Sequence, residues 1–162
     1  MRTAGVFVLG LLLGSLVSTT LAQGNRLSGM NGVNHVGIYV TNFDESMAFF
    51  TQKMGFREAF TVRDDKGQPM LAYLQASRNT FVELQPANAA DRTPGISHFG
   101  LHVDDIKGTI AALRQRGVTV TDARASSAKS LIANVSAPDG VRIELSELGP
   151  ESLATKATES WK

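Results

Sequence analysis

Hydrophobic and polar residues alternate along several short stretches of this chain, and two of these stretches run directly into a helical pattern. Residues 33–40 alternate and are rich in β-branched side chains, which predicts a strand. In the stretch that follows, apolar residues recur at helical spacing: Phe43, Met47, Phe50 and Met54. Asn42 and Glu45 stand in capping-box relation at its start and Gly55 ends it, so we expect one helix with a single buried face.

After this helix the pattern predicts two or three strands, at 56–63, 70–76 and 80–85. Residues that favour turns separate them: Asp65-Lys66-Gly67 and Arg78-Asn79. The stretch 86–95 is rich in Pro, Gly, Asn and Ala, and we expect it to link the first half of the chain to the second.

The second half of the chain repeats this order of elements. It has a strand at 96–103 and a helix at 105–116 that ends before Gly117. The inward-facing residues of that helix are Ile106, Ile110 and Leu113. Three strands follow, near 118–123, 130–135 and 141–145. The residues before the last strand, Pro138-Asp139-Gly140, are a strong hairpin signal. Taken together, the predicted elements follow the order βαβββ–βαβββ, which is an α+β fold.

The two halves also match residue by residue. The segment that starts at His35 aligns without gaps on the segment that starts at His98, at an offset of 98 − 35 = 63. The two sequences are HVGIYVTNFDESMAFF and HFGLHVDDIKGTIAAL. Glu83 matches Glu144 near the end of each half, at an offset of 144 − 83 = 61. A period of about 60 residues is longer than that of the common solenoid repeats. It indicates one supersecondary unit that has been duplicated, with a histidine at its start and a glutamate at its end.

Because side chains alternate along a strand, the two faces of each predicted strand can be separated. In the first and last strands of both halves, the apolar face has a helix to pack on. The opposite face collects eight polar groups: His35, Tyr39, Glu83, Gln85, His98, His102, Arg142 and Glu144. So many polar side chains on the concave side of a curved sheet predict a functional site rather than a core.

A lone histidine or glutamate on a strand is usually solvated or hydrogen-bonded, but here both recur at equivalent places in the two halves. Approximate two-fold symmetry would bring four of them together: His35, Glu83, His98 and Glu144. Two imidazoles and two carboxylates suit a borderline divalent ion with open water positions, such as Zn, Ni, Fe or Mn. His102 is at the position equivalent to Tyr39, so we interpret it as a group that lines the cavity or faces the substrate.

The N-terminal 22 residues have the pattern of a secretory signal peptide. Arg2 precedes the apolar run 6–13, and small residues lead to a cleavage site after Ala22. The alternative is a membrane anchor, for which an apolar span of ~20 residues would be expected. We therefore expect an exported protein, periplasmic or secreted, with 162 − 22 = 140 residues.

Composition narrows the range of partners. There is no cysteine, so stability must come from burial without disulfides. Removing Arg2 leaves 16 − 1 = 15 basic side chains against 15 acidic ones, and no Lys/Arg cluster stands out. This argues against nucleic acid or an anionic membrane surface as partner. Nothing after residue 22 is long and apolar enough to cross a membrane. The partner that we expect is a small-molecule substrate at the polar face of the sheet described above.

Four segments resemble the vicinal oxygen chelate superfamily: NHVGIYV, FVEL, SHFGLHVDDI and PDGVRIEL. This superfamily includes glyoxalase I, methylmalonyl-CoA epimerase, ring-cleaving dioxygenases and the fosfomycin and bleomycin resistance proteins. The resemblance covers about residues 32 to 148. It implies one domain at 30–148, with βαβββ modules at 32–86 and 96–148 that form a partly open barrel around a metal, often in a homodimer. The tail at 149–162 could form a short helix that buries Leu153 and Trp161, or be frayed.

The resemblance also implies roles for individual residues. The glyoxalase-type metal ligands would be His35, Glu83, His98 and Glu144. Glu144, or Glu83 by the pseudo-symmetry, would move a proton as general base. Four side chains on the same face would contact the substrate: Tyr39, Gln85, His102 and Arg142. The expected protein is an exported lyase or isomerase, similar to lactoylglutathione lyase, for a small α-oxygenated compound.

Two other functions stay open. An extradiol dioxygenase needs only His35, His98 and Glu144, which leaves Glu83 unexplained. A binding protein would sequester a small molecule or a metal without turnover. The chain also departs from glyoxalase I, because Tyr39 stands where that enzyme commonly has an arginine and Ala87 where it has an asparagine. The epimerase commonly has a glutamine at the position of Glu83.

Overall fold

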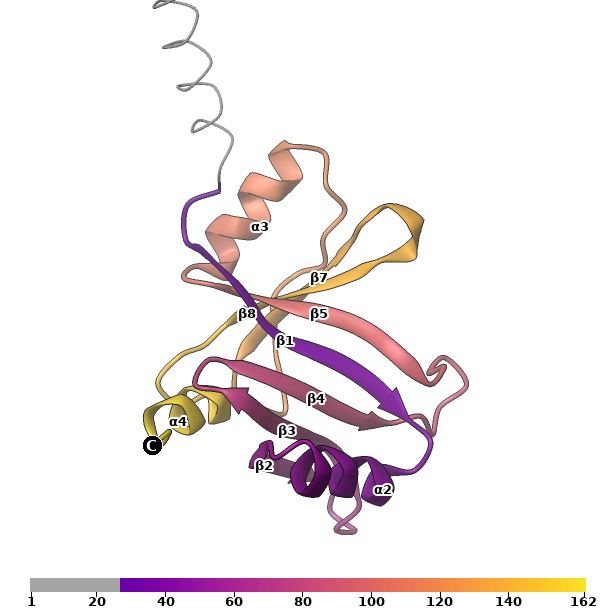
Figure 1. Cartoon of the computed structure of the whole chain (residues 1–162). Helices are drawn as coiled ribbons and strands as arrows, with labels where there is room; N and C mark the ends of the chain where they lie inside the picture. Colours follow the sequence, from indigo (N-terminus) through magenta and orange to yellow (C-terminus); the bar gives the residue numbers. More distant parts are fainter. Residues whose placement is uncertain (1–26) are drawn as a thin grey trace, which may run out of the picture.

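Eight strands form one curved sheet in the computed structural model, which describes residues 27–162 (Figure 1). The strands are β1 (Met30–Val40), β2 (Arg57–Arg63), β3 (Pro69–Ser77), β4 (Thr80–Pro86), β5 (Gly95–Val103), β6 (Arg124–Ala125), β7 (Leu131–Ser136) and β8 (Arg142–Glu147). The helical elements are α2 (Phe43–Ala48), the π-helical turn η1 (Phe49–Lys53), α3 (Ile106–Gln115), the 3-10 turn η2 (Pro138–Gly140) and α4 (Leu153–Glu159). The signal peptide expected at 1–22 lies outside the described residues.

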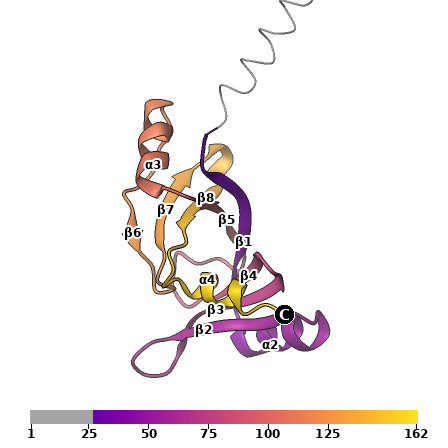
Figure 2. The same cartoon turned by 90° about the vertical axis from the view of Figure 1, so that its left-hand side faces the viewer.

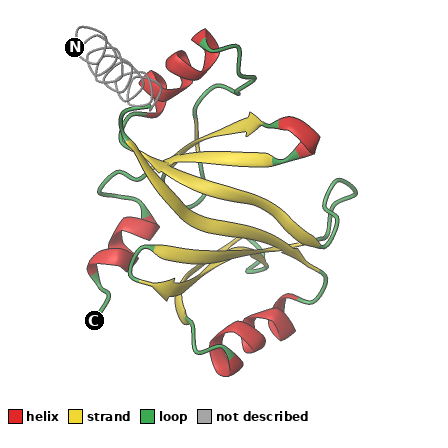
Figure 3. Ribbon diagram, turned by 45° about the horizontal axis from the view of Figure 1, so that its top comes forward, coloured by secondary structure: helices red, strands yellow, loops and turns green. Residues whose placement is uncertain are grey.

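The two halves of the sheet have the same internal order and meet at β1 and β5. The sheet order is β2-β3-β4-β1-β5-β8-β7-β6, in which β1 pairs with β4 and β5 with β8, both in parallel. β1 and β5 run antiparallel, side by side through the middle of the sheet (Figure 3). The predicted α+β fold of two βαβββ modules forming a partly open barrel is therefore confirmed, and the β1–β5 ladder is the seam between the modules.

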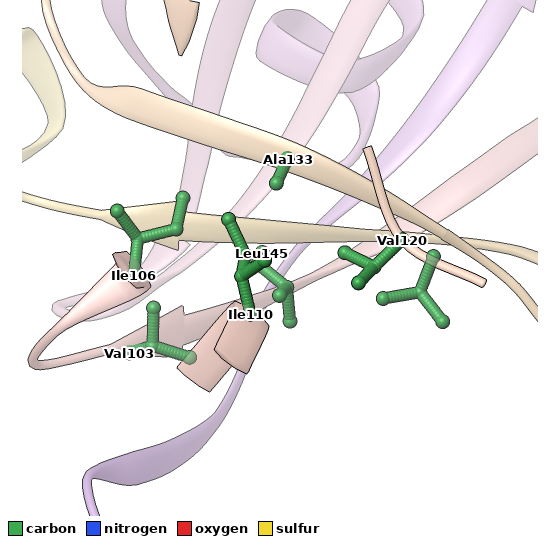
Figure 4. Packing of buried hydrophobic residues seen from close by; sticks show 7 residues of the cluster. Val103, Ile106, Ile110, Val120, Ala133 and Leu145 are labelled. Atoms are coloured by element: carbon green, nitrogen blue, oxygen red, sulfur yellow. The ribbon is translucent and has the colours of Figure 1, made fainter. Parts of the chain in front are cut away.

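Helices α2 and α3 pack on the outer face of the sheet, one on each module. Asn42 and Asp105 cap them, because the side chain of each accepts a hydrogen bond from the backbone N–H three residues further on, at 3.1 and 3.0 Å. Seven buried residues, from α3 itself and from the strands and loop beneath it, form the cluster under α3 (Figure 4): Val103, Ile106, Ile110, Val120, Ala133, Val135 and Leu145. Under α2, the corresponding buried residues are Val40, Leu74 and Leu84. The predicted packing of the apolar strand faces against helices is confirmed.

The prediction of a strand at 118–123 is wrong. Val120 makes only an isolated bridge to Val135, and the short strand β6 comes later, at Arg124–Ala125. The alternation in this stretch arises because Val118 and Val120 pack into the cluster under α3 rather than into a ladder of the sheet.

The buried stripe predicted for the first helix is wrong at its last residue. Phe43, Met47 and Phe50 pack against the cluster under α2, but Met54 is 52% exposed. The cause is the widened turn η1, in which the N–H of Met54 donates to the carbonyl of Phe49, five residues back. A π-helical turn rotates the following side chain away from the face set by the α-helical period.

The C-terminal tail folds back onto the inner face of the first module. Of the two alternatives left open by the sequence, the structure has the helix: α4 lies on the opposite face of the first module from α2 (Figure 2). Its buried residues are Ala154 and Ala157, which join a cluster with Tyr73 and Phe81. Trp161 instead lies at the end of the tail, where the guanidinium of Arg57 is 5.5 Å from its ring.

No helix within residues 27–162 combines the length and the apolar composition needed to span a bilayer.

Candidate metal centre

Two histidines and two glutamates converge on the inner face of the sheet, at the seam between the modules. Nε2 of His35 lies 3.1 Å from Nε2 of His98. Oε2 of Glu83 lies 3.2 Å from His98 Nε2 and 3.8 Å from His35 Nε2, and Oε1 of Glu144 lies 3.6 Å from His35 Nε2. The four residues predicted as ligands are therefore brought together within one chain, each on a different strand.

Each histidine ring lies over a glycine of the opposite strand. In the β1–β5 ladder His35 pairs with Gly100, and Gly37 pairs with His98. A Cβ atom at Gly100 would lie well under 3.0 Å from Cε1 of His35, and a Cβ atom at Gly37 would collide with His98 in the same way. Only glycine leaves room for the rings to approach the neighbouring backbone so closely. The histidine of each His-x-Gly sequence thus reaches across the seam and lies against the glycine of the other module.

The outer ring nitrogens are held by the residue that precedes each histidine. Nδ1 of His35 lies 2.9 Å from Oδ1 of Asn34, and Nδ1 of His98 lies 2.9 Å from Oγ of Ser97. At His35, the Asn34 oxygen that accepts a hydrogen bond from Nδ1–H fixes the tautomer in which Nε2 offers its lone pair to a cation. Nη2 of Arg142 also lies 2.8 Å from Nδ1 of His98, so Arg142 reaches the edge of the centre.

The two carboxylates differ in burial and in pKa. The side chain of Glu83 is 5% exposed and that of Glu144 is 14% exposed. Burial raises the pKa of Glu144 above its usual 4.5, and the negative charge of Glu83 adds to this. Burial also acts to raise the pKa of Glu83, but the contact with His98 and the charge of His35 lower it overall. Glu83 is therefore held ionised, whereas Glu144 takes up a proton more readily.

Burial also fixes the protonation of two rings beside the carboxylates. It lowers the pKa of His35 from 6.5 to about 4, although the charge of Glu83 opposes this shift. His35 is therefore neutral near pH 7, which is the form that binds metals. The ring of Tyr73 lies 5.5 Å from that of His35. Burial, and then the charges of Glu83 and Glu144, raise the pKa of Tyr73 well above 10, so its hydroxyl keeps its proton.

The donor set fits a divalent cation. Oε2 of Glu83 is buried and has no hydrogen-bond partner among the described residues, although it lies close to both histidines. An unpaired buried carboxylate oxygen is costly unless a cation or donor satisfies it. One ligand atom each of His35, His98 and Glu144 lies within 4.8 Å of the others. Zn, Ni, Fe and Mn all accept such a set of nitrogen and oxygen donors.

A cavity of about 190 Å³ opens beside the two glutamates. Three of the residues predicted to contact a substrate line it: Tyr39, Gln85 and Arg142. Nε2 of Gln85 donates to Oε1 of Glu83 at 2.8 Å, so this amide orients a candidate ligand. Nη2 of Arg142 donates to the hydroxyl of Tyr39 at 3.3 Å.

His102 is not in this cavity, so the expectation that it faces the same site as the ligands is wrong. It lies four residues beyond His98 on β5, which is about 13 Å along a strand. There it lines a second cavity, of about 340 Å³, together with Phe81 and with Thr155 and Thr158 at the tail helix α4. The alternation of side chains along the strand predicted the face of the sheet on which His102 lies, but not its distance from the four candidate ligands.

Several residues at the site were missed in the sequence. Asn34 and Ser97 were detectable, because they stand at equivalent places directly before the two histidines. Others gave no periodic signal, since they come from the linker, the short strand β6 and the inner face of β3: Arg92, Arg124 and Tyr73.

Comparisons with known proteins agree with this architecture. Residues 32–145 match the model of the Glyoxalase/Bleomycin resistance protein/Dioxygenase superfamily. A probable chloroplastic lactoylglutathione lyase of Arabidopsis thaliana is 27% identical over 124 residues, which are 72% of this chain and 35% of that protein. The chain thus spans about a third of the length of that relative.

Solved structures of similar fold include two epimerases. Methylmalonyl-CoA epimerase from Mycobacterium tuberculosis superposes with a TM-score of 0.66 and 25% identity, covering 80% of this chain and 97% of that one. A variant of the Streptomyces coelicolor methylmalonyl-CoA epimerase, in complex with 2-nitronate-propionyl-CoA, gives a TM-score of 0.63 and 22% identity over 76% of this chain and 98% of its own.

Proposed function

Because the chain belongs to the glyoxalase/bleomycin resistance protein/dioxygenase superfamily, we propose that it is a metal-dependent lyase or isomerase acting on a small α-oxygenated compound. The observation that carries this proposal is the convergence of two histidines and two glutamates at the seam. The similarity to a probable lactoylglutathione lyase and to methylmalonyl-CoA epimerases supports the reaction class.

The four converging side chains would hold the metal: His35, Glu83, His98 and Glu144. A bound divalent ion supplies a Lewis acid that polarises a pair of substrate oxygens and so acidifies an adjacent C–H. Asn34 and Ser97 keep the imidazoles oriented, and Gln85 keeps Glu83 in place.

Glu144 is the general base in this proposal. Its carboxylate is the more exposed of the two and borders the cavity, so it can reach a substrate carbon. Glu83 is equivalent by pseudo-symmetry, but it is more deeply buried and its pKa is lowered. Arg142 holds an anionic part of the substrate beside Tyr39.

The decisive substitution is Glu144→Gln, which keeps the shape of the side chain and removes its base. We expect turnover to fall by at least about a hundredfold, in line with the usual contribution of general acid–base catalysis, while metal content falls only partly. Metal analysis and a metal-dependent assay with hemithioacetals and catechols measure both. Glu159→Gln, the same change on the exposed end of α4, is the control. Unchanged turnover in Glu144→Gln would refute the assignment.

An extradiol dioxygenase is the second candidate. One ligand atom each of His35, His98 and Glu144 lies within 4.8 Å of the others, and two histidines with one carboxylate form the facial triad of non-haem iron oxygenases. Glu83→Gln separates the two functions. A dioxygenase would keep its iron and its cleavage of catechols in this variant, whereas the lyase or isomerase would lose metal affinity and turnover together.

A binding protein would give a different result in the same measurements. Such a protein would bind no divalent metal, or would turn over none of the compounds, and would show a rise in melting temperature with a hydrophobic ligand.

We also propose that the protein is exported, cleaved after Ala22 and assembled as a homodimer. The support for export is the n-region, apolar run and small residues of the first 22 positions. N-terminal sequencing of protein from the periplasm or medium tests it, and an intact Met1 would contradict it. The support for a dimer is that β2 and β6 end the sheet with open edges. Analytical ultracentrifugation at high micromolar concentration tests it, and a monomer there would contradict it.

A further inference from the structure

Three arginines from three separate segments surround the cavity beside the glutamates. Arg92 comes from the linker between the modules, Arg124 from β6 and Arg142 from β8. Within residues 27–162, none of the three forms an ion pair with a carboxylate. Nε of Arg142 is moreover buried without a hydrogen-bond partner there. These guanidinium groups therefore have donors to spare.

Tyr39 holds two of the guanidinium groups without neutralising them. The guanidinium of Arg92 lies 5.4 Å from the centre of the Tyr39 ring and that of Arg142 lies 6.0 Å from it. Nη1 of Arg92 donates to the carbonyl of Pro86 at 3.2 Å. Stacking on an aromatic ring fixes the position of a charge but leaves it free to attract an anion.

The charges around the cavity do not balance once a divalent ion is bound. Glu83 and Glu144 carry two negative charges, which a divalent cation cancels. The three positive charges of Arg92, Arg124 and Arg142 then remain around a partly enclosed space. Guanidinium groups match carboxylate and phosphate oxygens in geometry and bind them with paired hydrogen bonds.

We propose that this cavity binds a small dianion: an α-hydroxy or α-oxo acid that carries a second acidic group, held by Arg92, Arg124 and Arg142. A volume of about 190 Å³ is below the ~300–1,000 Å³ of pockets for drug-sized ligands, which favours a compact acid. The inference rests on the proposed function, because the metal is what neutralises the two glutamates. It names the class of substrate for that same site.

Three probes with a similar oxygen pair and increasing charge test this directly: hydroxyacetone with none, lactate with one and tartronate with two negative charges. Isothermal titration calorimetry on the metal-loaded protein should show affinity rising in that order. Arg124→Gln should weaken tartronate about tenfold or more and leave hydroxyacetone unchanged. The control is Arg63→Gln, an exposed arginine at the end of β2 that should leave both affinities unchanged. Equal affinities for the three probes, or no effect of Arg124→Gln, would overturn the inference while the metal-dependent activity stands.

A second arm tests the arginines without a metal. The double substitution Glu83→Gln/Glu144→Gln removes the two negative charges that the cation would cancel, and circular dichroism checks that the fold is kept. Metal-free protein with this change should bind tartronate, and adding Arg92→Gln and Arg124→Gln should abolish that binding. If the double variant fails to fold, Glu144→Gln alone, which removes one charge, should still raise tartronate affinity in the metal-free protein. Wild-type protein that takes up no metal would end the proposed function, whereas failure to bind tartronate in this arm would end the inference by itself.

Discussion

At the scale of single residues, the two histidines depend on the glycines that face them. His35 lies against Gly100 and His98 against Gly37, in contacts too close for any side chain at the glycine. The glycines therefore fix the position of the candidate metal ligands without touching a metal or a substrate themselves.

Gly100→Ala and Gly37→Ala should each weaken metal binding. The new methyl group must push the opposing imidazole away, and overpacking of this kind costs about 1–3 kcal/mol. We expect metal affinity to fall at least tenfold, measured by competition with a chromophoric chelator.

Gly149→Ala is the matched control. Nothing lies within 4 Å of a Cβ atom at this position, so metal affinity should not change. Alanine at Gly100 with unaltered metal affinity would show that the rings can move aside freely, contrary to their buried position.

The buried His35 should also make the metal-free protein sensitive to mild acid. Its pKa is about 4 in the folded protein and 6.5 in the unfolded chain, so above pH 6.5 it is neutral in both states. Between pH 6.5 and about 4 the unfolded chain binds a proton that the folded protein does not, so stability falls as the pH falls. The loss should approach about 3 kcal/mol. The raised pKa of Glu144 acts in the opposite direction, because its folded form binds the proton more readily.

Comparison with His35→Gln isolates the histidine from Glu144. The free energy of unfolding, measured with urea in the presence of a chelator, should fall relative to this variant as the pH is lowered from 7.5 to 4.5. A difference between the two proteins that stays constant over this range would contradict the pKa of His35.

The positions of the four candidate ligands could be predicted from sequence because they recur. His35 and His98, like Glu83 and Glu144, stand at equivalent places in a duplicated unit, and strand alternation puts them on one face. Arg92 and Arg124 could not be found in this way. They reach the cavity from a linker and a two-residue strand, where no period relates sequence to direction.

At the scale of elements, the tail helix α4 makes the two modules unequal. Phe81 on β4 and Arg142 on β8 are equivalent in the repeat, yet Phe81 packs in the cluster with α4 whereas Arg142 lines the cavity. Because α4 fills part of the inner face of the first module, much of the polar lining of the cavity comes from the second.

Ala157→Leu should therefore destabilise the protein. Ala157 is 5% exposed where α4 meets the sheet, and a larger side chain there should cost about 1–3 kcal/mol. Chemical denaturation measures the loss. Glu159→Leu adds a similar side chain on the exposed end of the same helix and should change stability by less than about 0.5 kcal/mol. Equal effects of the two substitutions would mean that α4 does not pack as described.

Most elements were predictable, and the exceptions have local causes. Asn42, Asp105 and the turn at 138–140 are chemical signals that hold wherever they occur. The prediction of a strand at 118–123 failed because a loop that packs under a helix can show the same alternation as a strand, here through Val118 and Val120. The π-helical turn that starts at Phe49 turns Met54 away from the buried face, and a prediction from the regular α-helical period does not include such a turn.

At the scale of the whole molecule, the candidate centre joins the two modules. The four ligands come from β1, β4, β5 and β8, two strands on each side of the seam. A cation bound there would connect both modules in addition to the hydrogen bonds of the β1–β5 ladder.

Metal should accordingly raise the melting temperature of the whole protein in a single transition. At a free metal concentration a hundred times the dissociation constant, the stabilisation should be about 2.7 kcal/mol. Differential scanning calorimetry with and without a chelator measures it. The double variant Glu83→Gln/Glu144→Gln should show no such shift, and two separate transitions in the wild type would contradict the coupling of the modules.

The crossed His-x-Gly pairs on β1 and β5 are self-complementary: each strand supplies a ring and, two residues further on, the space for the ring of the other. A self-complementary contact of this kind is what a two-fold symmetric dimer uses, with the same surface on both partners. A single βαβββ module carrying one histidine, one glycine and one glutamate would therefore hold half of a site, and a second copy of itself would hold the rest. In this chain the linker at 86–95 makes that pairing intramolecular. Joining the modules also lets each half change independently, so that one can support α4 while the other supplies charged side chains to the cavity.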